Sequence, residues 1–158
     1  MKPRLILLAT LAAALAAPSG LAARTLLPGD PYDARIIAEH YCNKAALEVG
    51  FEASQLDQCR AVYDETVRVE RAAQRMTPSQ QNAIVVAKGL SMMTLSSGYA
   101  KHDGVMSARA CQAIAAIDQA LASYDPASPN GLESLYDLLV KTRDIAVPKC
   151  RIGGHWPG

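Results

Sequence analysis

Four cysteines are the residues of this chain with the clearest chemical potential. They stand at positions Cys42, Cys59, Cys111 and Cys150 of the 158-residue sequence. Thiols can bind a metal ion, attach a haem or pair as disulfides. Structural zinc sites use ligand pairs only a few residues apart, such as C-x₂-C, and no two cysteines are that close in this sequence. Because the C-x-x-C-H haem motif is also missing, we predict two disulfides, no metal site and no cofactor.

The pattern around the first two cysteines predicts how the four pair. Residues 50–54 have the composition of a turn between two antiparallel helices, and Cys42 and Cys59 lie at similar distances before and after it. With a rise of roughly 1.5 Å per residue, both cysteines should lie at the same height above the turn. Each also falls on the apolar face of its helix. We therefore expect Cys42 to pair with Cys59, which leaves Cys111 to pair with Cys150.

Histidine is the second candidate for chemistry, because its imidazole can act as a general base near neutral pH. The chain contains His40, His102 and His155. His102 is followed by Asp103, but Gly104 comes next and indicates the end of a helix rather than a rigid catalytic element. We expect no catalytic residue. A small disulfide-bonded hydrolase that uses His102 or His40 remains an alternative.

Residues 1–22 are typical of a secretory signal peptide. Lys2 and Arg4 provide a positive start, and the apolar run that follows is shorter than the roughly 20 residues needed to cross a bilayer. We expect cleavage after Ala22, with Ala23 as the alternative position. The mature protein would then be periplasmic or secreted, where an even number of cysteines is typical of disulfides.

The charge balance argues against a nucleic-acid partner. The full chain has 16 Lys and Arg residues against 15 Asp and Glu residues. Two of the basic residues lie in the signal segment, so the mature chain would carry a slight net negative charge. Such a chain has no general electrostatic attraction to nucleic acid or to an anionic membrane surface. We also expect no stable membrane span after the signal is removed.

Capping residues and apolar periodicity predict five helices. They are expected at about 31–50, 54–73, 77–100, 105–124 and 132–147. Because the connectors are short and no alternating β pattern is present, the sequence predicts an all-α fold, a compact bundle in a single domain over residues 31–150. Residues 23–30 and 151–158 are expected to be flexible ends.

Local signals define the middle of this bundle most clearly. Thr77, Pro78 and Gln80 together predict a capped helix start with a reciprocal capping box. Residues 83–100 carry Lys88 as their one charge, which predicts a central helix that is buried on most sides. The preceding helix is expected to begin with Ser54 as its cap.

These features favour a non-catalytic binding module, such as an inhibitor, immunity or adaptor protein. The expected partner is another envelope or extracellular protein, because the sequence contains no convergent set of catalytic residues. A carrier of a small molecule or lipid is the main alternative. Its cavity would be lined by Met92, Met93 and Met106, although methionines at helical spacing also serve as adaptable core residues.

Overall fold

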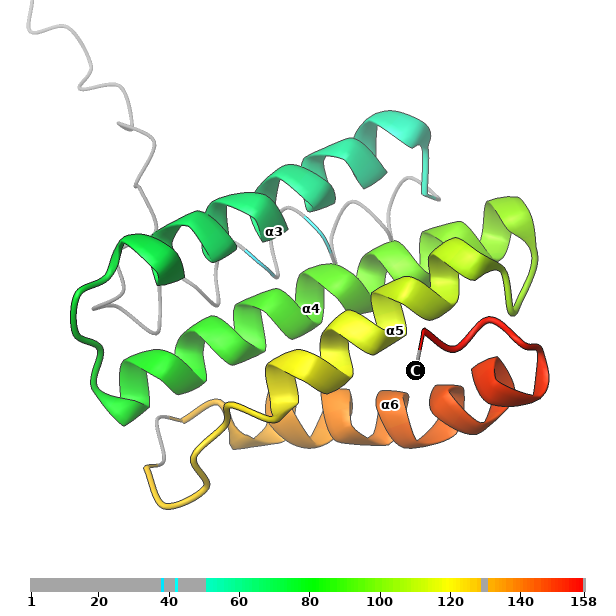
Figure 1. The fold of residues 1–158 in the computed structure, drawn as a ribbon. Helices are drawn as coiled ribbons and strands as arrows, with labels where there is room; N and C mark the ends of the chain where they lie inside the picture. Colours follow the sequence, from blue (N-terminus) through cyan, green and yellow to red (C-terminus); the bar gives the residue numbers. More distant parts are fainter. Residues whose placement is uncertain (1–37, 39–41, 43–50, 129–130, 158) are drawn as a thin grey trace, which may run out of the picture.

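The structure, a computed structural model, describes Ala38, Cys42 and the ranges 51–128 and 131–157, and the described residues form four helices and no strand (Figure 1). The helices are α3 (Ala53–Ala72), α4 (Pro78–Asp103), α5 (Ala108–Leu121) and α6 (Glu133–Ile152). The predicted all-α class is confirmed. The described part has four helices rather than the expected five, because the helix predicted over 31–50 lies outside it apart from Ala38 and Cys42. The predicted signal segment also lies outside the described residues.

The start of α4 follows directly from three residues of its own sequence. Thr77 is the N-cap and Pro78 occupies the first turn. The backbone N–H of Gln80 donates to Thr77 Oγ1 at 3.2 Å, and the Thr77 N–H donates to Gln80 Oε1 at 2.8 Å. This reciprocal pair satisfies two N–H groups that a helix start otherwise leaves without partners. The predicted capping box is confirmed.

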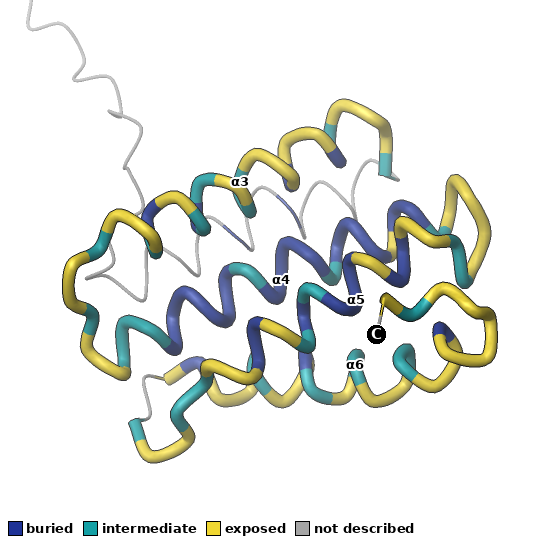
Figure 2. The backbone as a smooth tube through the Cα atoms, viewed as in Figure 1, coloured by how far each residue is buried: buried dark blue, intermediate teal, exposed yellow. Residues whose placement is uncertain are grey.

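Helix α4 is the centre of the bundle, as its composition predicts. Figure 2 shows it buried along nearly its whole length, while the other helices turn exposed faces to solvent. Its one mid-helix charge, Lys88, is only partly exposed and pairs with Glu70 of α3 at 2.8 Å. Gln81 donates to the other oxygen of the same carboxylate at 2.9 Å. The lysine is therefore tolerated beside the core because an acid of a neighbouring helix neutralises it.

Two glycines of α4 allow neighbouring helices to approach closely. A Cβ at Gly89 would clash with the side chain of Leu139 in α6, and one at Gly98 would clash with Leu56 in α3. The helix passes through Gly98 without interruption and ends at Gly104, whose φ of +99° favours glycine. Of the two glycines that predict a break before the next helix, Gly104 ends α4, while Gly98 stays within the helix because that turn packs against Leu56.

Two other predicted helix boundaries are corrected by long-range or side-chain contacts. Helix α3 is capped by Glu52 rather than by Ser54, and the Glu52 N–H donates to Gln55 Oε1 at 2.8 Å. Helix α6 was expected to end before Pro148, yet it continues to Ile152. A proline inside a helix removes one backbone hydrogen bond. The disulfide at Cys150 offsets that loss because it holds the last turn of α6 against α5.

The connection between α5 and α6 is held by one buried amide. Asn82 is fully buried in α4, and its Nδ2 donates to the carbonyl oxygens of Asp125 and Ser128 at 2.8 and 2.9 Å. Its Oδ1 accepts a hydrogen bond from the Asp125 N–H at 2.8 Å. A buried amide with these three bonds is well satisfied, so it fixes the connector over the start of α4.

The residues after α6 fold back along its end. The His155 N–H donates to the Cys150 carbonyl at 3.0 Å. Trp156 is partly buried against the core, and the Arg151 guanidinium lies 5.7 Å from the centre of its ring. Flexibility of residues 151–158 stays a prediction. The contacts of Arg151, His155 and Trp156 place these three residues against the end of α6 and the core.

Candidate functional site

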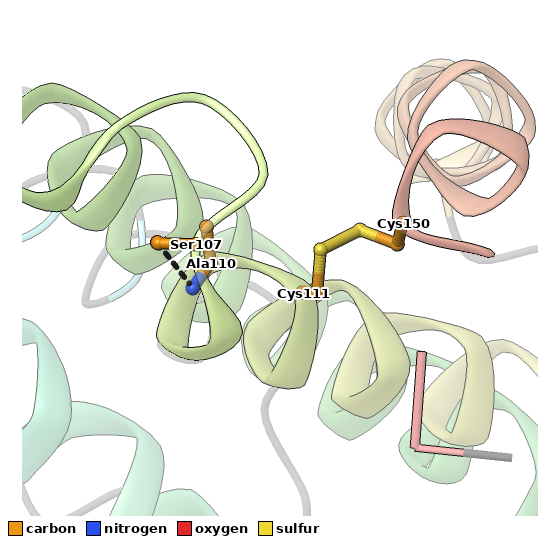
Figure 3. The surroundings of a disulfide bond; sticks show 4 residues. All are labelled: Ser107, Ala110, Cys111 and Cys150. Atoms are coloured by element: carbon orange, nitrogen blue, oxygen red, sulfur yellow. Dashed lines mark hydrogen bonds between the residues drawn. A yellow bond between two sulfur atoms is a disulfide. The ribbon is translucent and has the colours of Figure 1, made fainter. Parts of the chain in front are cut away.

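A disulfide joins the two helices that form one side of the bundle. Cys111 of α5 and Cys150 of α6 are both buried, and their sulfur atoms lie 2.07 Å apart with the Cα atoms at 5.7 Å (Figure 3). Cys111 lies one turn into α5, after the cap at Ser107, whose hydroxyl accepts a hydrogen bond from the Ala110 N–H. The predicted pairing of Cys111 with Cys150 is confirmed.

The other two cysteines meet but do not form a disulfide in this structure. Cys42 and Cys59 are both fully buried, and their thiols are hydrogen bonded to each other. The bond from Cys59 is the largest influence on the Cys42 thiol and lowers its pKa, and a hydrogen bond from Ser91 acts in the same direction. The same contact with Cys42, together with burial, raises the pKa of Cys59. The structure thus brings the predicted pair together and places Cys42 as the more acidic thiol.

We predict that this pair closes into a second disulfide when the mature protein is refolded in a glutathione redox buffer. The Cys42 thiolate would attack oxidised glutathione, and Cys59 would then displace glutathione from the mixed disulfide. Peptide mapping without reduction should return a peptide linked through Cys42 and Cys59. The peptide linked through Cys111 and Cys150 is the internal control. Complete alkylation of Cys42 and Cys59 in the same sample would show that the second bridge does not form.

The histidines do not assemble a catalytic group within the described residues. The His102 ring nitrogen Nε2 is hydrogen bonded to the backbone carbonyl of Phe51, not to an acid or a hydroxyl. Asp103 instead binds Arg109 through two hydrogen bonds of 2.6 and 2.7 Å, and this guanidinium holds the pKa of Asp103 below its usual value. His155 is exposed, and His40 lies outside the described residues.

Metal-binding clusters and membrane-spanning helices are both absent from the part of the chain that the structure describes. It contains no group of three or more His, Cys, Asp or Glu side chains placed to hold a metal ion. None of its helices combines the length and the apolar character that a bilayer crossing requires.

The most distinctive surface feature is a hollow between the ends of three helices, which we call the apolar groove. It encloses about 300 Å³ and is open to solvent. One wall consists of Ala100 near the end of α4, Val105 and Met106 in the following connection, and Ala110 and Ile114 of α5. Most of this wall is hydrocarbon, so the groove favours apolar groups over sugars or nucleotides.

The second wall of the apolar groove is the C-terminal half of α6. It contains Thr142, Ile145, Ala146, Lys149 and the disulfide-bonded Cys150. The hydroxyl of Thr142 donates to the Leu138 carbonyl of its own helix at 2.8 Å, so it offers the groove little polar character. Because Cys150 is bonded to Cys111 of α5, the disulfide fixes the distance between the two walls of the groove.

Exposed apolar side chains continue from the groove along α6. Leu138, Ile145 and Ile152 follow one another at steps of seven residues, and they are 42%, 62% and 88% exposed. Val105, across the groove from Ile145, is 69% exposed. Residues seven apart lie on nearly the same face of a helix. The outer face of α6 thus carries an unpartnered apolar stripe among the described residues, formed by Leu138, Ile145 and Ile152.

Sequence reasoning found only part of this surface. Of the three predicted methionines, Met92 is core and Met93 is partly buried, with its sulfur 3.6 Å from Thr142 Oγ1. Met106 does line the apolar groove. The seven-residue spacing of Leu138, Ile145 and Ile152 was visible in the sequence. Only the folded structure shows that these three side chains are exposed to solvent.

Comparison of the chain with protein-family models, with curated proteins and with solved structures gave no significant match. No family, activity or partner can therefore be taken from a relative. The functional argument rests on the surface chemistry of this chain, above all on the groove and the stripe beside it.

Proposed function

We propose that the protein is an exported, non-catalytic binding module that docks onto another envelope or extracellular protein. The signal-like N-terminus and the even cysteine count support export to the periplasm or the medium. The observation that carries the proposal is the apolar stripe on α6, formed by Leu138, Ile145 and Ile152. Large apolar side chains gathered on one exposed face are typical of interaction surfaces.

The spacing of the stripe favours an α-helix of the partner. Residues seven apart stay on nearly the same face of a helix over several turns, so a helix packed along α6 contacts all three side chains. Burying one such side chain contributes on the order of 1.5–3 kcal/mol. The three stripe residues, with Val105 beside Ile145, therefore offer a partner helix several apolar contacts.

We expect Ile145→Asp to abolish recovery of the partner when the mature, oxidised protein is used for affinity capture from envelope extract. A carboxylate in the centre of the stripe would have to be desolvated in the complex, which costs several kcal/mol. Gln112→Asp, at an exposed position on α5, is the matched control and should recover the partner as well as the wild type does. Equal recovery by Ile145→Asp, or no partner for any form, would contradict the proposal.

A carrier of small apolar molecules is the second candidate function. The specific observation in its favour is the apolar groove, whose volume of about 300 Å³ lies at the lower limit of small-molecule sites. The hydrolase alternative has less support, because His102 is bound to a backbone carbonyl and Asp103 to Arg109.

A further inference from the structure

We propose that the apolar groove is a binding site for a single-chain amphiphile with an anionic head group, such as a fatty acid. The acyl chain would lie between α5 and α6, and the head group would meet the ammonium group of Lys149. This goes beyond the docking function proposed above, since it concerns the hollow beside the stripe. The proposal names a class of ligand for the carrier alternative. Any role in transport depends on that alternative.

The interior of the groove matches a hydrocarbon chain in chemistry and in size. Ala100, Ala110, Ile114 and Ala146 contribute only aliphatic groups to the walls. The volume of the open groove, about 300 Å³, is that of about ten water molecules. This volume suits one short acyl chain rather than a lipid with two chains. A chain that enters the groove also covers part of Val105 and Ile145, which the unliganded protein exposes at its edges.

Two hydroxyl groups that line the groove are bound within their own helices. The Ser97 hydroxyl donates to the Met93 carbonyl at 3.1 Å, and the Thr142 hydroxyl donates to the Leu138 carbonyl. These two hydroxyls are thus already engaged and offer a ligand little hydrogen bonding. The ligand part that fills the groove should therefore be apolar.

The charge at the edge of the groove determines the preferred head group. Among the described residues that line it, Lys149 is the only charged one, and none is acidic. Lys149 makes no ion pair with any described residue, whereas its neighbour Arg151 lies over Trp156. A lysine can lay its aliphatic stem along the apolar wall and keep its ammonium group in water. An anionic head group would therefore gain one favourable pairing that a neutral or cationic one lacks.

Calorimetric titration of the mature, oxidised protein with dodecanoate, below its micellar concentration, tests the proposal. We expect one site, and binding about fivefold tighter than that of dodecanol, which is the effect expected of an exposed ion pair. Dodecyltrimethylammonium should bind more weakly than either. A parallel titration with lauroyl lysophosphatidylglycerol compares a phospholipid-derived source with the free acid. Tighter binding of dodecanoate indicates a free fatty acid as the ligand, and tighter binding of the lysophospholipid indicates a phospholipid-derived ligand. Either result supports an anionic amphiphile.

Three variants separate the tail from the head group. Lys149→Met should bind dodecanoate and dodecanol equally, because it keeps an apolar stem without the charge. Lys141→Met, the same change at an exposed position of α6 outside the groove, should behave like the wild type. Ala146→Trp should fill the groove and abolish binding of both ligands. Thermal unfolding of each variant confirms that it is folded.

Three outcomes would overturn the assignment. Absence of dodecanoate binding to the wild type at millimolar concentration would remove the assignment and the carrier alternative as well. Dodecanol and dodecanoate binding equally to the wild type would remove the anionic preference and leave an unspecific apolar site. Full binding by Ala146→Trp would place the ligand elsewhere. The docking function is judged separately, by the capture experiment with Ile145→Asp.

Discussion

Replacing Cys111 and Cys150 together by alanine is expected to lower the free energy of unfolding by about 4 kcal/mol. The bridge closes a loop with a sequence separation of 39 residues, and this constraint is lost from the unfolded chain when the bridge is removed. We expect the destabilisation to extend to the end of α6, because Pro148 weakens that helix just before the bridge. Urea denaturation monitored by circular dichroism of the oxidised protein measures the change.

The control for this disulfide variant is the wild-type protein in excess reductant, which should lose at least as much stability, because the reductant also opens the predicted bridge between Cys42 and Cys59. Alanine at both positions avoids the added complication of an unpaired buried thiol. A change below about 1 kcal/mol would mean that the bridge contributes little beyond the packing of α5 against α6. The role assigned to the disulfide in fixing the groove walls would then be wrong.

Leu139→Ala is expected to lower the free energy of unfolding by about 3 kcal/mol, within the range for a fully buried leucine. Leu139 has no exposed surface, and its methyl groups occupy the space beside Gly89 of α4. Removing them leaves a cavity at the contact between α4 and α6. Leu138→Ala is the matched control on the adjacent residue, and it should cost less than about 1 kcal/mol because Leu138 is substantially exposed.

A double-mutant cycle shows whether Gly89 and Leu139 act as a unit. Gly89→Ala alone should destabilise the protein, because the added Cβ clashes with Leu139. This clash outweighs the gain of about 1 kcal/mol in helix propensity that alanine has over glycine. In the Leu139→Ala background the same methyl group has room and partly fills the cavity. Gly89→Ala should therefore stabilise that background, with a coupling of about 1–3 kcal/mol. Strictly additive effects would show that the two residues do not share this space.

The groove, unlike the second cysteine pair, depends on residues that are far apart in the chain. Met106 and Cys150 meet at the groove although more than forty positions separate them, a spacing that carries no local signal. The pairing of Cys42 with Cys59 had such a signal, because the sequence predicts a turn between them, and the structure places their thiols in contact. Whether that contact becomes a disulfide is the question that peptide mapping answers.

By itself, the sequence determined the all-α class, the start of α4 at Thr77 and the burial of α4. It also determined the pairing of Cys111 with Cys150. The first three features depend on hydrogen bonds to near neighbours or on apolar periodicity, so they can be recognised within a short window. The cysteine pairing followed by elimination, once Cys42 was assigned to Cys59. Only the tertiary structure decided that α6 continues through Pro148 and that three helix ends leave an apolar groove. The reason is that each results from contacts between distant segments, whose free energy outweighs the local preferences of the residues involved.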